Sequence, residues 1–480
     1  MTLLLCLAPL LANADAGLVV LALPEIQRDL GMSLSGAHWV TNVYVLLVGG
    51  LQLLGGRLSD RVGARRLLLG SLVAFGLASA LCGAAPNGPV LLVARAGQAV
   101  AAALLVPAAM CLLLTTVPVA ERRRALAWWV VCGGVGSVAG VLLGGMAVSR
   151  LDWRWAFFLN VPVALLAWAA GRRWCPRCPR EGSRGLPLDV AGALFLVGTL
   201  VTFVYALVGT AGHGVSGGTW ALFAAAGVSG ALFLRRQRTA RDPLLPAVLW
   251  RDRRLAVGAA GILFVAASTG PVMFVASLYL QEVRGYGAWM AGCALLPVVG
   301  GVLVVGRVCA RMLGRSGARR AALVGCALSG AGLVALTRVA PESGYATGLL
   351  PGLALLGAGL PFLWMAYETA AVAEVRASSM GAAAGVVQCA GQIGAAIGLA
   401  LVVTVYGGAG SGAADPALVA RGAARAFWLC AGLMGCVALT AWFGLRAGRG
   451  AESCGSAPAP GYAPSSTRPA SGERPAVPSR

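Results

Sequence analysis

Apolar segments of about 20 residues follow one another along almost the whole chain, and this feature constrains the fold most. The hydrocarbon core of a bilayer is about 30 Å thick and needs about 20 apolar residues per helix. Only 11% of the 480 residues are charged and 58% are hydrophobic, which excludes a water-soluble domain. We predict an all-α integral membrane protein with fourteen transmembrane helices, at residues 3–23, 38–56, 66–85, 89–116, 125–149, 155–171, 188–209, 218–234, 255–281, 288–310, 319–337, 345–367, 381–406 and 422–446.

The first apolar run is similar to a secretory signal peptide because small residues follow it from Ala12 to Ala16. It lacks a basic leading region, however, and apolar sequence resumes through Leu23. We therefore predict that it is the first spanning helix. The very short leader suggests that the true start lies upstream of Met1.

Arginine clusters between the apolar runs predict the orientation of the chain. The net charge is +21, and cytoplasmic loops of membrane proteins collect basic residues. We expect both termini in the cytoplasm of a multi-pass protein of the cell (inner) membrane. Short clusters without interleaved aromatic residues argue against nucleic-acid binding. The clusters in alternate loops are Arg57 to Arg66, Arg122 to Arg124, Arg172 to Arg184, Arg235 to Arg254 and Arg311 to Arg320.

The sequence offers no set of residues for a metal, a cofactor or an enzymatic reaction. Its 13 cysteines lie mostly in apolar runs, where a free thiol behaves as a small hydrophobe. Cys175 and Cys178 have ligand spacing, but no second pair completes a zinc site. A nucleotide-binding loop ending in Gly-Lys is impossible, because every basic residue is Arg. We expect neither a cofactor nor direct use of ATP.

An internal repeat divides the chain. The sequence Gly63-Ala64-Arg65-Arg66 recurs as Gly317-Ala318-Arg319-Arg320, and 317 − 63 = 254 residues corresponds to about eight helices with their loops. Chance recurrence in an Arg- and Gly-rich chain is the alternative. We predict a six-helix bundle in residues 1–172, a two-helix insertion with linkers in 173–254, a six-helix bundle in 255–447 and a disordered cytoplasmic tail in 448–480.

The loop after the second apolar run carries the most specific motif. Its glycines allow a tight turn, and Asp60 can pair with nearby arginines or with a helix N-terminus. The stretch resembles the signature loop of the major facilitator superfamily, which implies a gate that holds the cytoplasmic helix ends together in one state. A positive-inside topology signal without a gating role is the alternative. The motif residues are Gly56, Asp60, Arg61, Gly63, Arg65 and Arg66.

Two opposite charges lie inside apolar runs of the first half. Arg95 stands in Arg95-Ala96-Gly97-Gln98, which is similar to the Arg-x-x-Gln-Gly of the superfamily's fourth helix. Asp15 precedes Ala22-Leu23-Pro24, as an Asp does in the fourteen-helix drug exporters. Buried ions are costly unless they are paired or hydrated, so we predict that Asp15 and Arg95 pair and couple transport to protons. A purely structural pair is the alternative.

The fifth run presents Gly136, Gly140 and Gly144 on one helix face, with Gly145 beside the last. This pattern is similar to the antiporter motif of exporters, except that Val141 replaces the proline. Because the proline is replaced, two alternatives remain. The glycines serve only for close helix packing, or the protein is an uptake permease.

Further segments resemble the fourteen-helix drug:proton antiporters, including Asp152 to Pro162, Leu188 to Gly192 and Tyr279 to Glu282. The resemblance covers all fourteen predicted helices. We expect the amides of Gln98, Gln388 and Gln392 to be candidates for the substrate cavity, although interhelical hydrogen bonding explains the last two equally well. Glu368 is predicted at the membrane interface, and His213 in a solvated outer loop.

The resemblance implies a monomeric secondary transporter that exports small hydrophobic compounds, such as drugs or antibiotics, in exchange for protons. Its partners are then the substrate, protons and the lipid bilayer. A proton-coupled uptake permease and a transport-inactive membrane regulatory protein remain alternatives.

Overall fold

The computed structural model describes residues 2–118, 121–150, 152–175, 189–213, 217–240, 243–245, 249, 252–340, 342, 344–376, 379–407 and 416–445, and every regular element among them is helical. The first half contains α1 (Thr2–Leu5), α2 (Leu7–Asp29), α3 (Leu34–Val62), α4 (Ala64–Gly83), α5 (Gly88–Thr116), α6 (Arg122–Arg150), α7 (Trp155–Phe158) and α8 (Asn160–Trp174). Two helices follow, α9 (Val190–His213) and α10 (Gly217–Thr239). The second half contains α12 (Arg253–Glu282), α13 (Ala288–Ala294), α14 (Leu296–Leu336), η1 (Tyr345–Leu349), α15 (Leu350–Val372), α16 (Met380–Gly407), α17 (Pro416–Leu439) and η3 (Thr440–Gly444), where η marks a π-helical turn.

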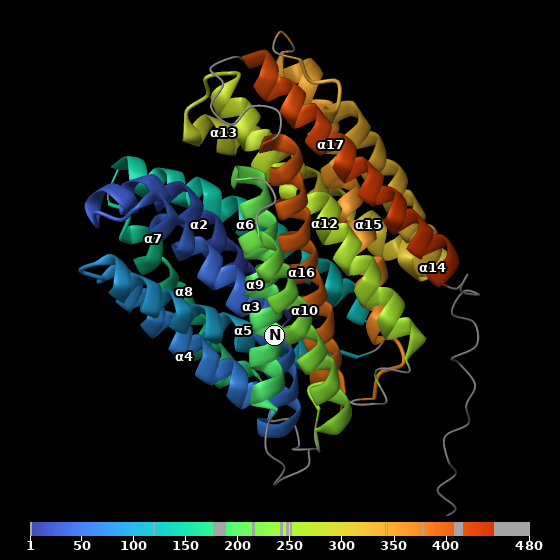
Figure 1. Ribbon diagram of the computed structural model, residues 1–480. Helices are drawn as coiled ribbons and strands as arrows, with labels where there is room; N and C mark the ends of the chain where they lie inside the picture. The colour runs from blue at the N-terminus through green and yellow to red at the C-terminus, as the bar shows by residue number, and fades with distance from the viewer. Residues whose placement is uncertain are drawn as a thin grey trace, which may run out of the picture.

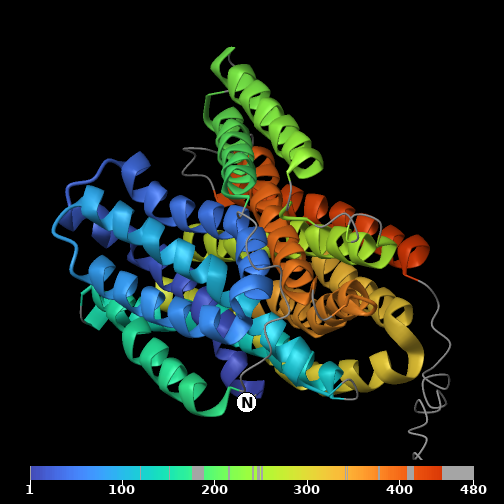
Figure 2. The same cartoon turned by 90° about the horizontal axis from the view of Figure 1, so that it is seen from below.

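The helices form two bundles that lie side by side. The blue to teal helices α2 to α8 occupy one side of Figure 1, and the yellow to red helices α12 to α17 occupy the other. The green helix α9 packs against α3 of the first bundle and α16 of the second. α10 packs against α9 and stands outermost in Figure 2.

Twelve helical stretches of the described chain are long and apolar enough to cross a membrane, so the predicted count of fourteen is not reached. The difference arises at two places. One stretch of 48 residues, Trp289–Leu336, contains both predicted runs 288–310 and 319–337. The described apolar part of α9, Val190–Ala206, is shorter than a full span.

In the described part of the chain four glycines adopt a positive φ, and their spacing repeats. Gly317, with φ 78° and ψ 170°, interrupts α14, and Gly63 with φ 92° separates α3 from α4. Gly31 and Gly285 are the other two, so the pairs are separated by 285 − 31 = 254 and 317 − 63 = 254 residues. The backbone thus turns at matching points of the two halves, in the register of the sequence repeat. A side chain at these positions would strain the backbone.

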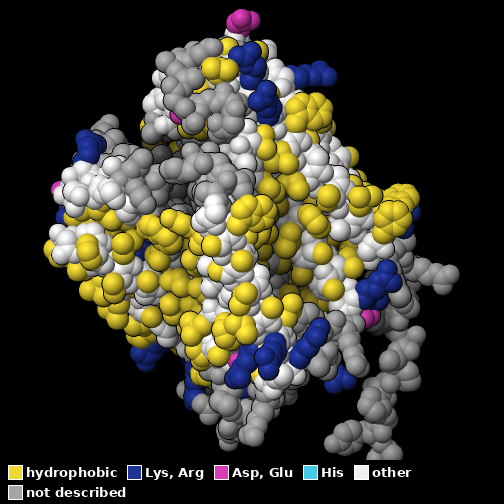
Figure 3. Space-filling view, in the orientation of Figure 1, with side chains coloured by type: hydrophobic (Ala, Val, Ile, Leu, Met, Phe, Trp, Pro, Cys, Tyr) yellow, Lys and Arg dark blue, Asp and Glu magenta, His cyan; other side chains and the backbone are white. Residues whose placement is uncertain are grey.

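The outer surface is apolar over a broad band. In Figure 3, yellow apolar side chains cover the middle of the visible face and arginines lie mostly toward its margins. Large apolar side chains such as Val304 and Phe443 are 76% and 72% exposed. Such a surface is stable in lipid and not in water. Charged side chains that are buried inside the bundles therefore stand out as candidate functional groups.

Candidate functional site

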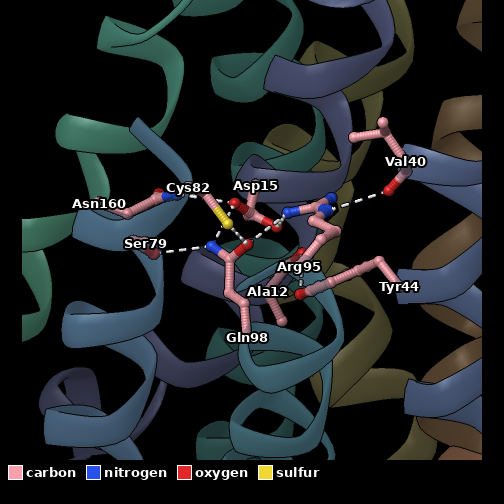
Figure 4. Close-up of polar contacts among 9 residues, drawn as sticks. All are labelled: Ala12, Asp15, Val40, Tyr44, Ser79, Cys82, Arg95, Gln98 and Asn160. Atoms are coloured by element: carbon pink, nitrogen blue, oxygen red, sulfur yellow. Dashed lines mark hydrogen bonds and ion pairs between the residues drawn. The ribbon is translucent and has the colours of Figure 1, made fainter. Parts of the chain in front are cut away.

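Asp15 lies at the centre of a buried polar network in the first half (Figure 4). Its Oδ2 accepts a hydrogen bond from Nη1 of Arg95, on α5, at 2.5 Å. Its Oδ1 accepts bonds from Nε2 of Gln98 at 2.8 Å and from Nδ2 of Asn160, the first residue of α8, at 2.7 Å. The predicted contact between Asp15 and Arg95 is therefore present, and both side chains are fully buried.

Arg95 is held by groups from α3 as well. Its Nε donates to the carbonyl of Val40 at 3.2 Å, and its guanidinium lies 4.1 Å from the ring centre of Tyr44. The hydroxyl of Tyr44 donates to the carbonyl of Ala12, one turn before Asp15. Removing one partner of a buried pair leaves an uncompensated charge, which costs about 3–5 kcal/mol. The pair is thus stable only as a unit.

Gln98 belongs to this network and not to the substrate cavity, which corrects the sequence prediction. Its Nε2 donates to Ser79 at 2.6 Å as well as to Asp15, and its Oε1 accepts from Arg95 at 2.6 Å. The side chain is fully buried on the side of α5 that faces α2 and α4. Its amide is therefore occupied by fixed partners.

A cavity of about 360 Å³ lies between the two halves. Its wall includes Gln388 and Gln392 of α16, as predicted for cavity-lining amides, and Gln52 of α3. Nε2 of Gln388 also contacts Sδ of Met110 across the halves at 3.2 Å. Asp15 is not among the described lining residues, but Tyr44, which stacks on Arg95, is. Tyr44 therefore separates the cavity from the buried ion pair.

Glu368 lines this cavity from α15, and its position at the membrane interface stays a prediction. The side chain is only 2% exposed, and the residue lies inside the apolar span Tyr345–Val372. Its Oε2 has no hydrogen-bond partner in the described part of the chain. Glu368 is also the one charged residue among the described residues of the cavity wall.

The signature loop connects the two halves. Asp60, near the end of α3, accepts hydrogen bonds from the backbone N–H groups of Gly381 and Ala382 at 2.8 and 2.9 Å. These groups lie in the first turn of α16, where a carboxylate is favoured by the helix dipole. Gly56 lies against Gly381 and Gly385 so closely that a Cβ would meet backbone atoms. The predicted loop is helical at Gly56 and Asp60, and these residues of α3 hold its end against the start of α16.

The other motif residues lie on either side of this junction. Gly63 supplies the positive-φ turn into α4. Nη2 of Arg65 donates to the carbonyl of Arg172 at the end of α8, at 2.8 Å. Arg61 is half-buried and Arg66 is exposed. Asp60 and Gly56 therefore contribute to the contact between the halves, and Arg65 ties α4 to α8 within the first half.

The predicted glycine face of α6 packs on the backbone of α2. A Cβ at Gly136, Gly140 or Gly144 would meet the carbonyl oxygens of Leu10, Ala14 and Leu18, respectively. Side-chain surroundings at Val141 and Gly145 lie outside the described residues. The close approach fixes the part of α2 from which Asp15 reaches its partners on α5 and α8.

The second half contains a matching glycine face that sequence reasoning missed. A Cβ at Gly394 or Gly398 of α16 would meet the carbonyl oxygens of Leu263 and Ala267 of α12. The offsets 394 − 140 and 398 − 144 both equal 254. The same close packing through glycines therefore occurs in both halves.

Asn160 and Tyr44 were also missed, although each carries a sequence signal. Asn160 is a lone amide within an apolar segment, and such groups in membrane helices face polar partners. The sequence signal for Tyr44 is weaker, because aromatic residues are common in apolar helices. Its role depends on α3 packing beside α5.

At the other end of the first half, Asp29 joins α2 to the segment before α8. Oδ2 accepts from the indole N–H of Trp153 at 3.0 Å and from Arg154 at 2.8 Å. These hydrogen bonds, first that of Trp153, lower the pKa of Asp29. The carboxylate therefore stays charged at neutral pH and ties the ends of these helices together.

His213 lies at the end of α9 and not in the predicted loop, and its side-chain surroundings are outside the described residues. The predictions on Cys178 and on the tail at 448–480 also lie outside the described residues. Among the described residues, no group of three His, Cys, Asp or Glu side chains could hold a metal ion.

Comparison with known proteins agrees with this architecture. Residues 5–399 match the family model described as Major Facilitator Superfamily. The chain is 38% identical to the puromycin resistance protein pur8 of Streptomyces alboniger over 412 residues, covering 84% of this chain and 80% of pur8. It is 33% identical to the cephamycin export protein CmcT of Amycolatopsis lactamdurans over 414 residues, covering 85% of each.

The fold is also similar to a solved structure. The proton:xylose symporter XylE, bound to 6-bromo-6-deoxy-D-glucose, superposes with a TM-score of 0.66 at 15% sequence identity. The match covers 92% of this chain and 94% of XylE. At this identity the likeness concerns the fold alone.

Proposed function

Because the chain belongs to the Major Facilitator Superfamily, we propose that it exports small hydrophobic compounds, such as drugs or antibiotics, across the cell membrane in exchange for protons. The names of two relatives support an exporter, since one confers puromycin resistance and the other exports cephamycin. The part of the proposal that concerns protons rests on the buried ion pair of Asp15 and Arg95. A carboxyl whose surroundings change between two states can take up and release a proton.

We propose that the two halves rock about the central cavity, with the contact of Asp60 forming and breaking in each cycle. Its two hydrogen bonds to α16 close one end of the interface between the halves. Releasing them would open that end, which we assign to the cytoplasm from the arginine distribution. The bundle boundaries proposed are 1–172 and 255–447, with 173–254 as an insertion, because α9 and α10 lie outside both bundles.

Fourteen membrane crossings remain our proposal for the topology. A straight helix of 48 residues would be about 72 Å long, more than twice the thickness of the hydrocarbon core. Gly317 supports two crossings there, because its φ and ψ end the helical path. α9 and α10 then form one hairpin, and both termini face the cytoplasm.

Cysteine labelling tests this topology in a chain whose native cysteines have been replaced. Gly217→Cys, between α9 and α10, should react with an impermeant reagent added outside intact cells, since a Cβ there meets open space. Ser465→Cys should react only after the cells are permeabilised. Labelling of residue 465 in intact cells would contradict the proposed orientation.

The transport proposal is tested by efflux from cells that express the chain. Puromycin, ethidium and the uncharged dye N-phenyl-1-naphthylamine would be measured with and without a protonophore. We expect export of at least one compound against its gradient, and loss of that gradient with the protonophore. One proton moving down 100 mV supplies about 2.3 kcal/mol, enough for about a 50-fold gradient of a neutral compound. Export that persists without a proton gradient, or accumulation inside the cells, would refute the proposal.

A further inference from the structure

The cavity wall contains two buried hydrogen-bond acceptors that nothing in the described chain satisfies. Oε2 of Glu368 is one, and Oε1 of Gln52 is the other. The two residues are 2% and 1% exposed, and they line the same cavity from α15 and α3. Leaving a buried polar atom unpaired costs about 1–3 kcal/mol, and more for a charged group. A ligand in the cavity that donates hydrogen bonds would remove this cost.

Charge narrows the class of ligand. No Arg or His is present among the described residues that line the cavity, so Glu368 has no counter-charge in its wall. Asp15, by contrast, is fully buried with Arg95. An ionised Glu368 would be the one unbalanced charge in the described wall, and a cation bound in the cavity would supply the missing counter-charge.

The size of the cavity and its aromatic lining limit the class of ligand further. A cavity of about 360 Å³ falls at the small end of pockets that hold drug-sized molecules. Trp364 lies one turn before Glu368 on α15, and Trp129 and Tyr44 line the cavity from the first half. Aromatic faces attract organic cations and bury apolar groups.

We propose that Glu368 recognises the positive charge of a lipophilic organic cation, and that Gln52 accepts a hydrogen bond from the same ligand. This inference rests on the proposed export function and specifies one substrate class for it. A ligand held by both residues contacts both halves, because Glu368 belongs to the second and Gln52 to the first. Neutral hydrophobic compounds use the apolar wall without the charge of Glu368.

Binding to the purified full-length protein tests the inference separately from transport. Ethidium, a permanent cation with amino groups, and the uncharged N-phenyl-1-naphthylamine are titrated by fluorescence. Glu368→Gln should weaken ethidium binding about 10- to 100-fold, the size of one charge-assisted hydrogen bond, and change the affinity for the neutral dye less than about twofold. Glu368→Asp should retain part of the ethidium affinity. Glu374→Gln is the control, because Glu374 is 60% exposed and pairs with Arg254 away from this cavity.

Unchanged ethidium binding by Glu368→Gln would overturn the inference, as would an equal loss of both dyes that Glu368→Asp does not relieve. If Glu368→Gln does not fold, Gln52→Leu provides the second test and should weaken ethidium binding selectively. A wild-type protein that binds the neutral dye but not ethidium also overturns the inference. That result leaves the proposed function intact, because protonophore-sensitive efflux of the neutral dye decides it independently.

Discussion

The two halves of the molecule repeat one helix pair but bury different charges. In the first half α6 lies on α2 through Gly140 and Gly144, and in the second half α16 lies on α12 through Gly394 and Gly398. The backbone turns at matching glycines 254 residues apart. The packing is therefore shared, and it gives neither half a distinct role.

The buried acidic residues of the two halves differ in their position and in their hydrogen-bond partners. Asp15 receives hydrogen bonds from three side chains and lies behind the cavity wall. Glu368 lies in the wall itself, with Oε2 unpaired in the described chain. Under the proposed function, Asp15 of the first half would handle the proton and Glu368 of the second half would contact the charge of the substrate.

Asp15→Asn is expected to have the largest effect on transport, and it tests the contrast between Asp15 and Glu368. Asn keeps the shape of Asp15 but loses the charge and one of its two acceptor oxygens, and it cannot titrate near neutral pH. We expect the protonophore-sensitive gradients of both ethidium and N-phenyl-1-naphthylamine to disappear, while downhill exchange persists. Glu368→Gln should instead spare the neutral dye.

The control for Asp15→Asn is Asp15→Glu, which keeps a titratable carboxyl and should retain part of the activity. Protein amounts and thermal stability would be matched, because Arg95 loses its partner in the Asn variant. A folded Asp15→Asn protein that still builds a gradient driven by protons would move the coupling role to another residue, and Glu368 would be the first to test.

A smaller effect is expected from Asp60→Asn, which acts where the halves meet. Asn loses the charge and one of the two acceptor oxygens that bind α16, a change of about 1–2 kcal/mol. We expect transport of both dyes to fall about tenfold with normal membrane insertion. Arg66→Gln, at an exposed position of the same motif, is the control. Wild-type transport by Asp60→Asn would reduce this loop to a topology signal.

The smallest effect concerns the packing that the halves share. Gly140→Ala and Gly394→Ala each place a methyl group against a backbone carbonyl of the neighbouring helix. Overpacking of this kind costs about 1–3 kcal/mol, so the melting temperature in detergent should fall by roughly 1–3 °C in both variants. Gly97→Ala has open space and should melt within about 1 °C of the wild type. A lower melting temperature in only one of the two variants would show that the glycine faces are not equivalent.

Much of the fold could be predicted because lipid imposes a simple rule on spanning segments. Apolar length located nearly every helix, and opposite charges inside apolar runs located Asp15 and Arg95. The helix count was harder, because Gly317 and the end of α9 decide how runs become separate spans. Those boundaries depend on local backbone geometry.

The candidate site was less predictable, because it depends on which helices become neighbours. Glu368 was placed at the interface from its position near the end of a run, yet α15 continues to Val372 and turns the carboxyl into the cavity. Gln98 was assigned to the cavity from its chemistry, although α4 and α8 supply partners that enclose its network. The position of a residue along its own helix does not show which side chains of the neighbouring helices face it.

The place of α9 limits the paths by which a molecule dissolved in the membrane could reach the cavity. α9 covers the seam between α3 and α16, where Val197 packs on Gly50 and Tyr205 stacks on Trp39 with ring centres 6.1 Å apart. Sideways entry from the lipid is blocked there. The other seam, where α6 meets α14 and α15, has no such cover among the described helices. The two seams between the halves therefore differ in the helix that covers them.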